Sequence, residues 1–380
     1  MRRSLVLVVL LAIPAPLTAQ FTALDAVVQA GVDRGVYPGA VVLVGTAATI
    51  LHQRGYGHFT WDPRSAVPDP STTLWDLASL TKVVATTAAA ALLVDQGRLA
   101  LDAPVQRFLP RFAGGAKAQV TVRMLLDHTS GLPAWVDFAR LTRDRAGALD
   151  LLYATPLRRP PGTRAEYSDL NAILLGLVIE QLTGRPLDRF TQDSIFGPLA
   201  MANTRFLPPD AWRSRIAPTG AWRGHPMAGE VNDQNSKRLG GVSGHAGLFA
   251  SGTDLGRYAQ WWLRRGRPLL HPATVDTFLT HDHTAGARLL GWESRTTEEY
   301  TPSPYGALLS AGAFGHTGWT GTMLWIDPDR DLFVIFLTNR SFGPRVAKPF
   351  TALHQIRAQV ADAAVRAAPG ACRAEIRPVC

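Results

Sequence analysis

A serine and a lysine three residues apart are the residues of this sequence best placed to do chemistry. They stand in Ser79-Leu80-Thr81-Lys82, at the start of an alanine-rich apolar run that extends to Leu93. Residues three apart share a helix face, so the lysine amine can reach the serine hydroxyl. A serine hydroxyl needs a base beside it to attack a carbonyl, and a lysine whose pKa is lowered by burial can serve. The pattern predicts a serine nucleophile at a helix N-terminus, where backbone N–H groups can hold an oxyanion.

A pattern of two specified residues occurs by chance in many chains, so its context matters. The chain contains only four lysines, and arginine carries nearly all of the positive charge. Lys82 lies in an otherwise apolar predicted helix, where an unpaired cation is costly. Both observations favour a functional role for Lys82 over a surface role.

Two further motifs stand at useful places. Tyr167-Ser168-Asp169 directly precedes a predicted helix, where a tyrosine can shuttle a proton if neighbouring cations lower its pKa. His316-Thr317-Gly318 lies on a predicted strand, and its glycine lets a ligand approach the strand edge. Taken alone, the tyrosine is more often a packing residue and the glycine more often marks a bulge.

The composition is that of an ordinary globular protein, with 46% hydrophobic and 18% charged residues in 380. The formal net charge is +9, but the arginines are scattered and no dense basic run with interleaved aromatic residues occurs. We therefore expect no nucleic-acid partner.

The N-terminus has the pattern of a secretory signal. Arg2 and Arg3 precede a short apolar stretch over 5–13, and Ala19 offers a small residue before a cleavage point. We expect cleavage near Ala19 and a periplasmic or secreted protein. No other segment approaches ~18 unbroken apolar residues, so we expect no stable membrane span in the mature protein.

The two cysteines, Cys372 and Cys380, both lie in the C-terminal tail. In an oxidising compartment they can close a small loop. A loop this short is expected to contribute little to the stability of the whole fold.

Hydrophobic periodicity and turn residues predict strands near both ends of the chain and helices between them. Thr121 and Ser168 are candidate helix caps, and Gly184 follows the end of a helix. The segment 212–247, rich in Gly, Arg and Asn, is predicted to be loop. The predicted helices cover 21–34, 79–96, 121–128, 169–182, 253–265, 272–280 and 351–366, and the predicted strands cover 39–44, 49–56, 289–292, 312–317, 322–326 and 332–339.

This order predicts an α+β fold in which one antiparallel sheet is flanked by N- and C-terminal helices. The expected organisation is a signal peptide (1–19), one hydrolase domain (20–367) and a tail (368–380). Within the domain, 20–65 and 241–367 form the α/β part and about 66–240 form a mainly helical inserted subdomain. A site is expected where the two parts meet, because clefts favour such junctions.

Together the motifs resemble those of the penicillin-recognising serine hydrolases, which include class C β-lactamases, D-alanyl-D-alanine carboxypeptidases and esterase relatives. Ser79-Leu80-Thr81-Lys82 is similar to the family's Ser-x-x-Lys box. Tyr167-Ser168-Asp169 resembles the Tyr-x-Asn box, and His316-Thr317-Gly318 resembles Lys-Thr-Gly. The segments 126–133 and 337–340 also look like family landmarks, so the resemblance covers nearly all of the mature chain.

The resemblance implies a role for each matching residue. Ser79 would form the acyl-enzyme, while Lys82 and Tyr167 would share the work of general base and proton shuttle. The backbone N–H groups of Ser79 and Trp319 would form the oxyanion hole. The substrate-binding residues would be Asp169, His316, Thr317 and Gly318. The resemblance implies no metal and no organic cofactor.

Two departures from the family pattern affect specificity. Asp169 replaces an asparagine, and an ionised carboxylate cannot donate a hydrogen bond but can pair with Lys82. His316 replaces a permanent cation, and a histidine is largely neutral at pH 7 unless a partner charges it. Both changes argue against efficient β-lactam hydrolysis and favour an esterase or a peptidase.

Other classes of protein fit the sequence less well. An α/β-hydrolase needs Gly-x-Ser-x-Gly, and the segment 241–245 fails at its last position. A class A β-lactamase would need a Ser-Asp-Asn box, which the chain lacks. His281 and His283 could bind zinc but have no clear third ligand. The loops 230–233 and 243–247 are candidates for lining the cleft.

We therefore expect a monomeric serine hydrolase that acylates Ser79 and hydrolyses an ester or amide. The substrate would be a small molecule, with a peptidoglycan stem peptide or a β-lactam among the candidates. A class C-like β-lactamase is the alternative within this class. A non-catalytic cell-wall or penicillin-binding protein is the alternative from another class.

Overall fold

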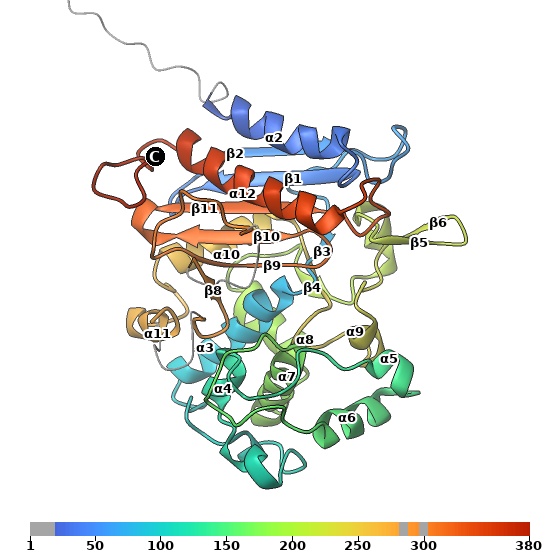
Figure 1. Ribbon diagram of the computed structural model, residues 1–380, viewed down its shortest axis with the longest axis vertical. Helices are drawn as coiled ribbons and strands as arrows, with labels where there is room; N and C mark the ends of the chain where they lie inside the picture. Colours follow the sequence, from blue (N-terminus) through green and yellow to red (C-terminus); the bar gives the residue numbers. More distant parts are fainter. Residues whose placement is uncertain (1–19, 281–287, 296–302) are drawn as a thin grey trace, which may run out of the picture.

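A six-stranded antiparallel sheet lies at the centre of the computed structural model, which describes residues 20–280, 288–295 and 303–380 (Figure 1). The spatial order of its strands is β2-β1-β11-β10-β9-β8. The strands are β1 (Gly39–Gly45), β2 (Ile50–Gly57), β8 (Glu293–Ser294), β9 (Phe314–Thr317), β10 (Met323–Asp327) and β11 (Leu332–Thr338). The first hairpin thus pairs with strands almost 300 residues later, as Ala40 opposite Thr338 illustrates.

Both faces of this sheet are buried, because successive side chains of a strand point to opposite faces. In β1, Val41 and Leu43 belong to one hydrophobic core, while Val42 and Val44 belong to the other. Helices α2 (Thr22–Asp33) and α12 (Pro349–Ala367) pack against each other over the second face (Figure 1). Helix α10 (Gly252–Leu263) covers the first face. The predicted α+β fold with flanking terminal helices is confirmed.

A mainly helical part lies on one side of the sheet, below it in Figure 1, and contains most of the residues between β2 and α10. Its central helix begins with a π-helical turn, η1 (Lys82–Thr87), and continues as α3 (Ala88–Asp95), whose residues Ala88–Leu93 are all buried. The other helices in this part are α4 (Val122–Leu126), α5 (Phe138–Leu141), α6 (Arg145–Ala154), α7 (Asp169–Thr183), α8 (Leu187–Thr191), η4 (Gln192–Phe196) and α9 (Gln234–Arg238).

Short elements complete the fold. A three-stranded sheet has the order β3-β7-β4, and β5 pairs with β6. These strands are β3 (Trp75–Asp76), β4 (Arg205–Phe206), β5 (Gly220–Trp222), β6 (His225–Met227) and β7 (Leu248–Ala250). The remaining helices are α11 (Pro272–Phe278) and the 3-10 turns η2 (Val105–Arg107), η3 (Gly115–Gln119), η5 (Asp210–Arg215) and η6 (Pro328–Arg330).

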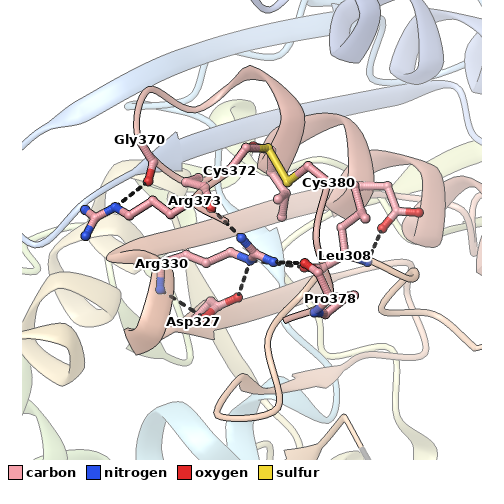
Figure 2. Close-up of a disulfide and its surroundings, with 11 residues drawn as sticks. Leu308, Asp327, Arg330, Gly370, Cys372, Arg373, Pro378 and Cys380 are labelled. Atoms are coloured by element: carbon pink, nitrogen blue, oxygen red, sulfur yellow. Dashed lines mark hydrogen bonds and ion pairs between the residues drawn. A yellow bond between two sulfur atoms is a disulfide. The ribbon is translucent and has the colours of Figure 1, made fainter. Parts of the chain in front are cut away.

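The C-terminal tail is tied to the sheet by a buried arginine. Cys372 and Cys380 form a disulfide, as the sequence allowed (Figure 2). Arg330, at the turn before β11, donates to the backbone oxygens of Leu308 (3.0 Å) and Pro378 (2.6 Å), and also to Ala371 O. The guanidinium therefore joins the tail to the body of the protein.

Three local predictions are wrong. Residues 289–292 are not a strand, because Gly291 at φ +82° turns the chain and Leu289 N–H donates to Trp292 O, so the strand begins at Glu293. The segment predicted as loop over 212–247 contains β5, β6 and α9. The side chain of Ser168 donates to Pro133 O instead of capping α7. Thr121 does cap α4, and Gly184 ends α7 in the left-handed conformation.

Two predictions concern segments outside the described residues: the signal peptide over 1–19 and the zinc ligands His281 and His283. Among the described residues, no helix combines the length and apolar character needed to cross a membrane.

Candidate active site

Ser79 lies in a tight turn between β3 and η1. Ala78, just before it, has φ +48°, a left-handed conformation that costs a non-glycine residue about 1–3 kcal/mol. Asp76 supports this turn, because its Oδ1 accepts from Ala78 N–H at 2.9 Å and its Oδ2 accepts from Asn232 N–H at 2.6 Å. Burial outweighs these hydrogen bonds and raises the pKa of the Asp76 carboxyl to about 6. The turn holds the serine at the start of the central helix.

Lys82 contacts the serine one helical turn later, as its spacing predicted. Its side chain is only 4% exposed, and Nζ donates to Ser79 Oγ at 2.9 Å and to His245 O at 3.2 Å. Asp169 Oδ1 lies 2.7 Å from the same Nζ, at ion-pair distance but without the angle of a hydrogen bond. The amine thus bridges the serine and the first residue of α7.

Tyr167 completes the contacts to Ser79. Its hydroxyl donates to Ser79 Oγ at 2.9 Å, and its ring packs against His128, with ring centroids 5.0 Å apart. Burial and the Asp169 charge raise the pKa of Tyr167 well above its usual value, and the hydrogen bond to Ser79 and the cation of Arg288 only partly oppose them. Proton shuttling by Tyr167 was predicted to depend on a pKa lowered by neighbouring cations. The pKa is raised instead, so the Tyr167 hydroxyl is neutral before a substrate binds.

The segment 316–318 packs against the serine turn without reaching the cavity described below. A Cβ added to Gly318 would lie 2.5 Å from Leu77 O, so this close approach requires glycine. Thr320 and Thr322 donate to the backbone oxygens of Asp76 (2.7 Å) and Leu77 (2.9 Å). Gly318, Thr320 and Thr322 therefore hold the turn that presents Ser79.

His316 is fully buried and neutral. Burial, with the cations of Lys82 and Arg288, lowers the pKa of His316 well below its usual value. Its Nδ1 donates to Thr317 O at 2.7 Å, and its Nε2 lies 3.7 Å from Glu293 Oε1. This histidine therefore does not supply the cation that its position in the motif suggested.

A cavity of about 450 Å³ opens over Ser79. Of the residues predicted for the site, Ser79, Tyr167, Asp169 and Trp319 line it, whereas Lys82, His316, Thr317 and Gly318 do not. The full lining is Ala78, Ser79, Trp135, Tyr167, Asp169, Asn232, Asp233, Gln234, Asn235, Ala246 and Trp319.

The predicted cleft loops contribute Asn232, Asp233 and Ala246 to this wall. The sequence did not point to Trp135, Gln234 or Asn235. The two amides follow Asp233, whose carboxylate accepts from Ser236 N–H at 2.7 Å and so begins α9. An aspartate at the N-cap position, such as Asp233, is a sequence signal that could have predicted the start of this helix.

The backbone near the serine offers donors for an oxyanion. No described residue accepts a hydrogen bond from the backbone N–H of Ser79 or of Trp319. The described part of the chain contains no group of three or more His, Cys, Asp or Glu side chains that could hold a metal.

Comparison with known proteins identifies the family. The Beta-lactamase family model matches residues 24–358, so the chain belongs to this family. An Escherichia coli (strain K12) protein named "Putative D-alanyl-D-alanine carboxypeptidase" is 32% identical, covering 86% of this chain and 83% of that protein. A Bacillus subtilis (strain 168) protein named N-acetylmuramyl-L-alanine amidase is also 32% identical, with the same coverage.

Solved structures share the fold. The hydrolase EstCE1, described as having promiscuous acyltransferase activity, superposes with a TM-score of 0.73 at 23% identity, covering 92% of this chain and 99% of that one. A penicillin-binding protein homologue from Caulobacter crescentus gives 0.73 at 22% identity, covering 92% and 98%. These likenesses confirm the predicted β-lactamase and transpeptidase-like fold.

Proposed function

We propose that this protein is a serine hydrolase that forms an acyl-enzyme on Ser79 and hydrolyses an ester or amide. The observation that carries the proposal is the double contact on one oxygen: Lys82 Nζ and Tyr167 OH each lie 2.9 Å from Ser79 Oγ. A serine hydroxyl contacted by an amine and a phenol, at the floor of a cavity, has the groups that nucleophilic catalysis requires.

The proton transfers follow from these contacts. Lys82, in its amine form, takes the proton of Ser79 as Oγ attacks the substrate carbonyl. The neutral Tyr167 hydroxyl gives its proton to the leaving group, and the phenolate then recovers a proton from the Lys82 ammonium. The N–H groups of Ser79 and Trp319 would hold the oxyanion, and such a donor is worth about 3–4 kcal/mol of barrier. Water then hydrolyses the acyl-enzyme by the same groups.

Substrate preference follows from the charges around the serine. The neutral His316 and the carboxylate of Asp169 argue against efficient β-lactam turnover. We rank esters and D-alanyl peptides above β-lactams as substrates. The enzyme would be periplasmic or secreted and would act on small-molecule or peptidoglycan-derived substrates. The name of the Escherichia coli relative supports a D-alanyl-D-alanine carboxypeptidase-like activity as the second candidate within this class.

A parallel rate panel tests the proposal. Purified protein and its Ser79→Ala variant are assayed with p-nitrophenyl esters, D-Ala-D-Ala peptides and nitrocefin. We expect ester or peptide turnover that exceeds nitrocefin turnover and is lost in the variant. Nitrocefin hydrolysis far faster than both would overturn the ranking. A stable penicillin adduct without any turnover would favour a non-catalytic penicillin-binding protein.

A further inference from the structure

One wall of the cavity is built from four consecutive polar residues, with Asn232 and Asp233 directly before α9 and Gln234 and Asn235 in its first turn. Asn235 is committed to the fold, because its amide accepts from Ala139 N–H at 3.2 Å and donates to Val136 O at 2.8 Å. Asp233 is likewise held by its Oδ1, which contacts Ser236 N–H and His245 Nε2 at 2.7 and 2.9 Å. The wall is therefore fixed in position before a substrate binds.

Asp233 presents a charge to the cavity. Its side chain keeps 27% of its surface exposed, and no described residue donates to its second oxygen, Oδ2. Burial raises the pKa of Asp233, but the neighbouring His245 and the Ser236 N–H outweigh it and bring the pKa to about 2. Ser243 Oγ lies 2.8 Å from His245 Nδ1, so both ring nitrogens of His245 have partners within the protein and Asp233 Oδ2 is left for a ligand.

The amides beside Asp233 add acceptors to this wall. Asn232 donates through Nδ2 to Thr219 O at 3.2 Å, and Gln234 donates through Nε2 to Asn232 O at 3.0 Å. Within the described chain, no donor contacts the side-chain oxygen of either residue. Besides the second N–H of each amide, this wall therefore offers a ligand three free acceptors, namely Asp233 Oδ2 and the side-chain oxygens of Asn232 and Gln234.

No cation among the cavity lining balances Asp233. The lining contains two carboxylates, Asp169 and Asp233, and neither lysine nor arginine. Lys82, next to the cavity, is already paired with Asp169. Arg340 lies behind Trp319, with its guanidinium 5.2 Å from the indole centroid and a hydrogen bond to Trp319 O.

The remaining walls also suit a cation. Trp135 and Trp319 line the cavity and are 50% and 60% exposed. Indole faces attract ammonium groups through their quadrupole, most strongly where water is partly excluded. The carboxylate charge, the free acceptors and the aromatic faces are therefore all compatible with a ligand that carries an ammonium group.

We propose that Asp233 is a specificity-determining residue and that the substrate carries a primary ammonium group, which binds against the 232–234 wall and the two indoles. This inference rests on the proposed function for its site and narrows it: amino-bearing esters or amides are favoured over carboxypeptidase substrates, whose terminal residue carries a free carboxylate.

A binding experiment that needs no turnover tests this inference. The Ser79→Ala protein is titrated calorimetrically with hexylammonium, hexanol and heptanoate, which share a six-carbon alkyl chain and differ in the charge of the head group. We expect hexylammonium to bind about tenfold or more tightly than heptanoate at low salt. Asp233→Asn, which keeps the Oδ1 acceptor of the cap, should remove most of this difference. Asp210→Asn, at a 93% exposed carboxylate outside the lining, should leave it unchanged.

Hexanol separates a loss of charge recognition from a loss of folding. Its affinity and the melting temperature should stay the same in the Asp233 variant. Equal affinities for the cation and the anion in the parent, or discrimination that survives Asp233→Asn, would overturn the inference. If the serine protein hydrolyses neutral esters while binding shows no charge preference, only this inference fails. If charge preference is present but no ester or amide is turned over, only the proposed function fails.

Discussion

Lys82 Nζ lies 2.7 Å from Asp169 Oδ1, and the same amine contacts Ser79 Oγ at 2.9 Å. The group that would take the serine proton is therefore also half of a buried ion pair. In the place of a neutral amide, Asp169 therefore puts a carboxylate at ion-pair distance from the amine. The pair is the feature that sets this site apart from the Tyr-x-Asn pattern that it resembles.

Replacing Asp169 with asparagine should move the pH dependence of ester hydrolysis. Removing a negative charge 2.7 Å from Lys82 Nζ makes loss of a proton from this site easier, so the limb of kcat/KM that rises with pH should shift to lower pH. The measurement is the full pH–rate profile. Asp150→Asn, which removes an exposed carboxylate paired with Arg111, serves as the control and should leave the profile in place. An unmoved limb in Asp169→Asn would show that the pair does not govern the base.

Replacing Tyr167 with phenylalanine removes the hydroxyl that contacts Ser79 and keeps the ring that packs on His128. We expect kcat to fall about 10²- to 10³-fold, as for the loss of a proton-transfer group. The melting temperature should hardly change. Tyr153→Phe, at a tyrosine outside the cavity lining, should retain full activity. A Tyr167 variant with parental kcat would exclude the phenol from proton transfer.

Asp76 should impose a pH dependence on stability. Its pKa is raised to about 6 in the folded protein, from 3.8 for a free aspartate, so the folded state binds the proton more tightly than the unfolded state does. The free energy of unfolding should fall as pH rises from about 4 to 6, by up to roughly 3 kcal/mol from this group. Asp76→Asn cannot titrate, so its stability should change less over this interval. Denaturant unfolding of the parent and of Asp76→Asn at about pH 4 and pH 6 makes the comparison. An equal change in the free energy of unfolding in the two proteins would contradict this prediction.

The disulfide in the tail should stabilise the fold through Arg330 as well as through loop closure. The buried guanidinium donates to Pro378 O within the closed loop, and release of the loop would remove that acceptor (Figure 2). Replacing both Cys372 and Cys380 with serine should cost ~2 kcal/mol of unfolding free energy and leave kcat unchanged. An unchanged stability would show that the disulfide contributes little to the fold, as expected from the short loop alone.

The sequence predicted the parts of this protein whose signal is local. The contact between Ser79 and Lys82 was predicted from their spacing, Tyr167 was singled out by its resemblance to the Tyr-x-Asn box, and the apolar run of β1 was sufficient to predict a strand. Strands β1 and β11 were predictable because they are apolar and bounded by turns. The structure of 289–292 was not predictable in the same way. Its apolar residues are buried like those of a strand, but Gly291 turns the chain and the segment pairs with none of the described strands of the sheet.

The parts that depend on distant partners could not be predicted. The sign of the Tyr167 pKa shift is decided by burial and by Asp169, against the opposing cation of Arg288. The position of Trp135 in the cavity wall is set by the packing of loops that are about 100 residues apart in sequence, as the hydrogen bond from Asn235 to Val136 O illustrates. No periodicity within either segment contains that information.

The central claim is that Ser79 is a nucleophile activated by its two neighbours. Intact mass spectrometry after incubation with a fluorophosphonate, followed by peptide mapping, tests it most directly. We predict one phosphonyl adduct per chain, on Ser79, that is absent in Ser79→Ala and forms much more slowly in Lys82→Ala. An unmodified protein, or an adduct on another residue, would contradict the account.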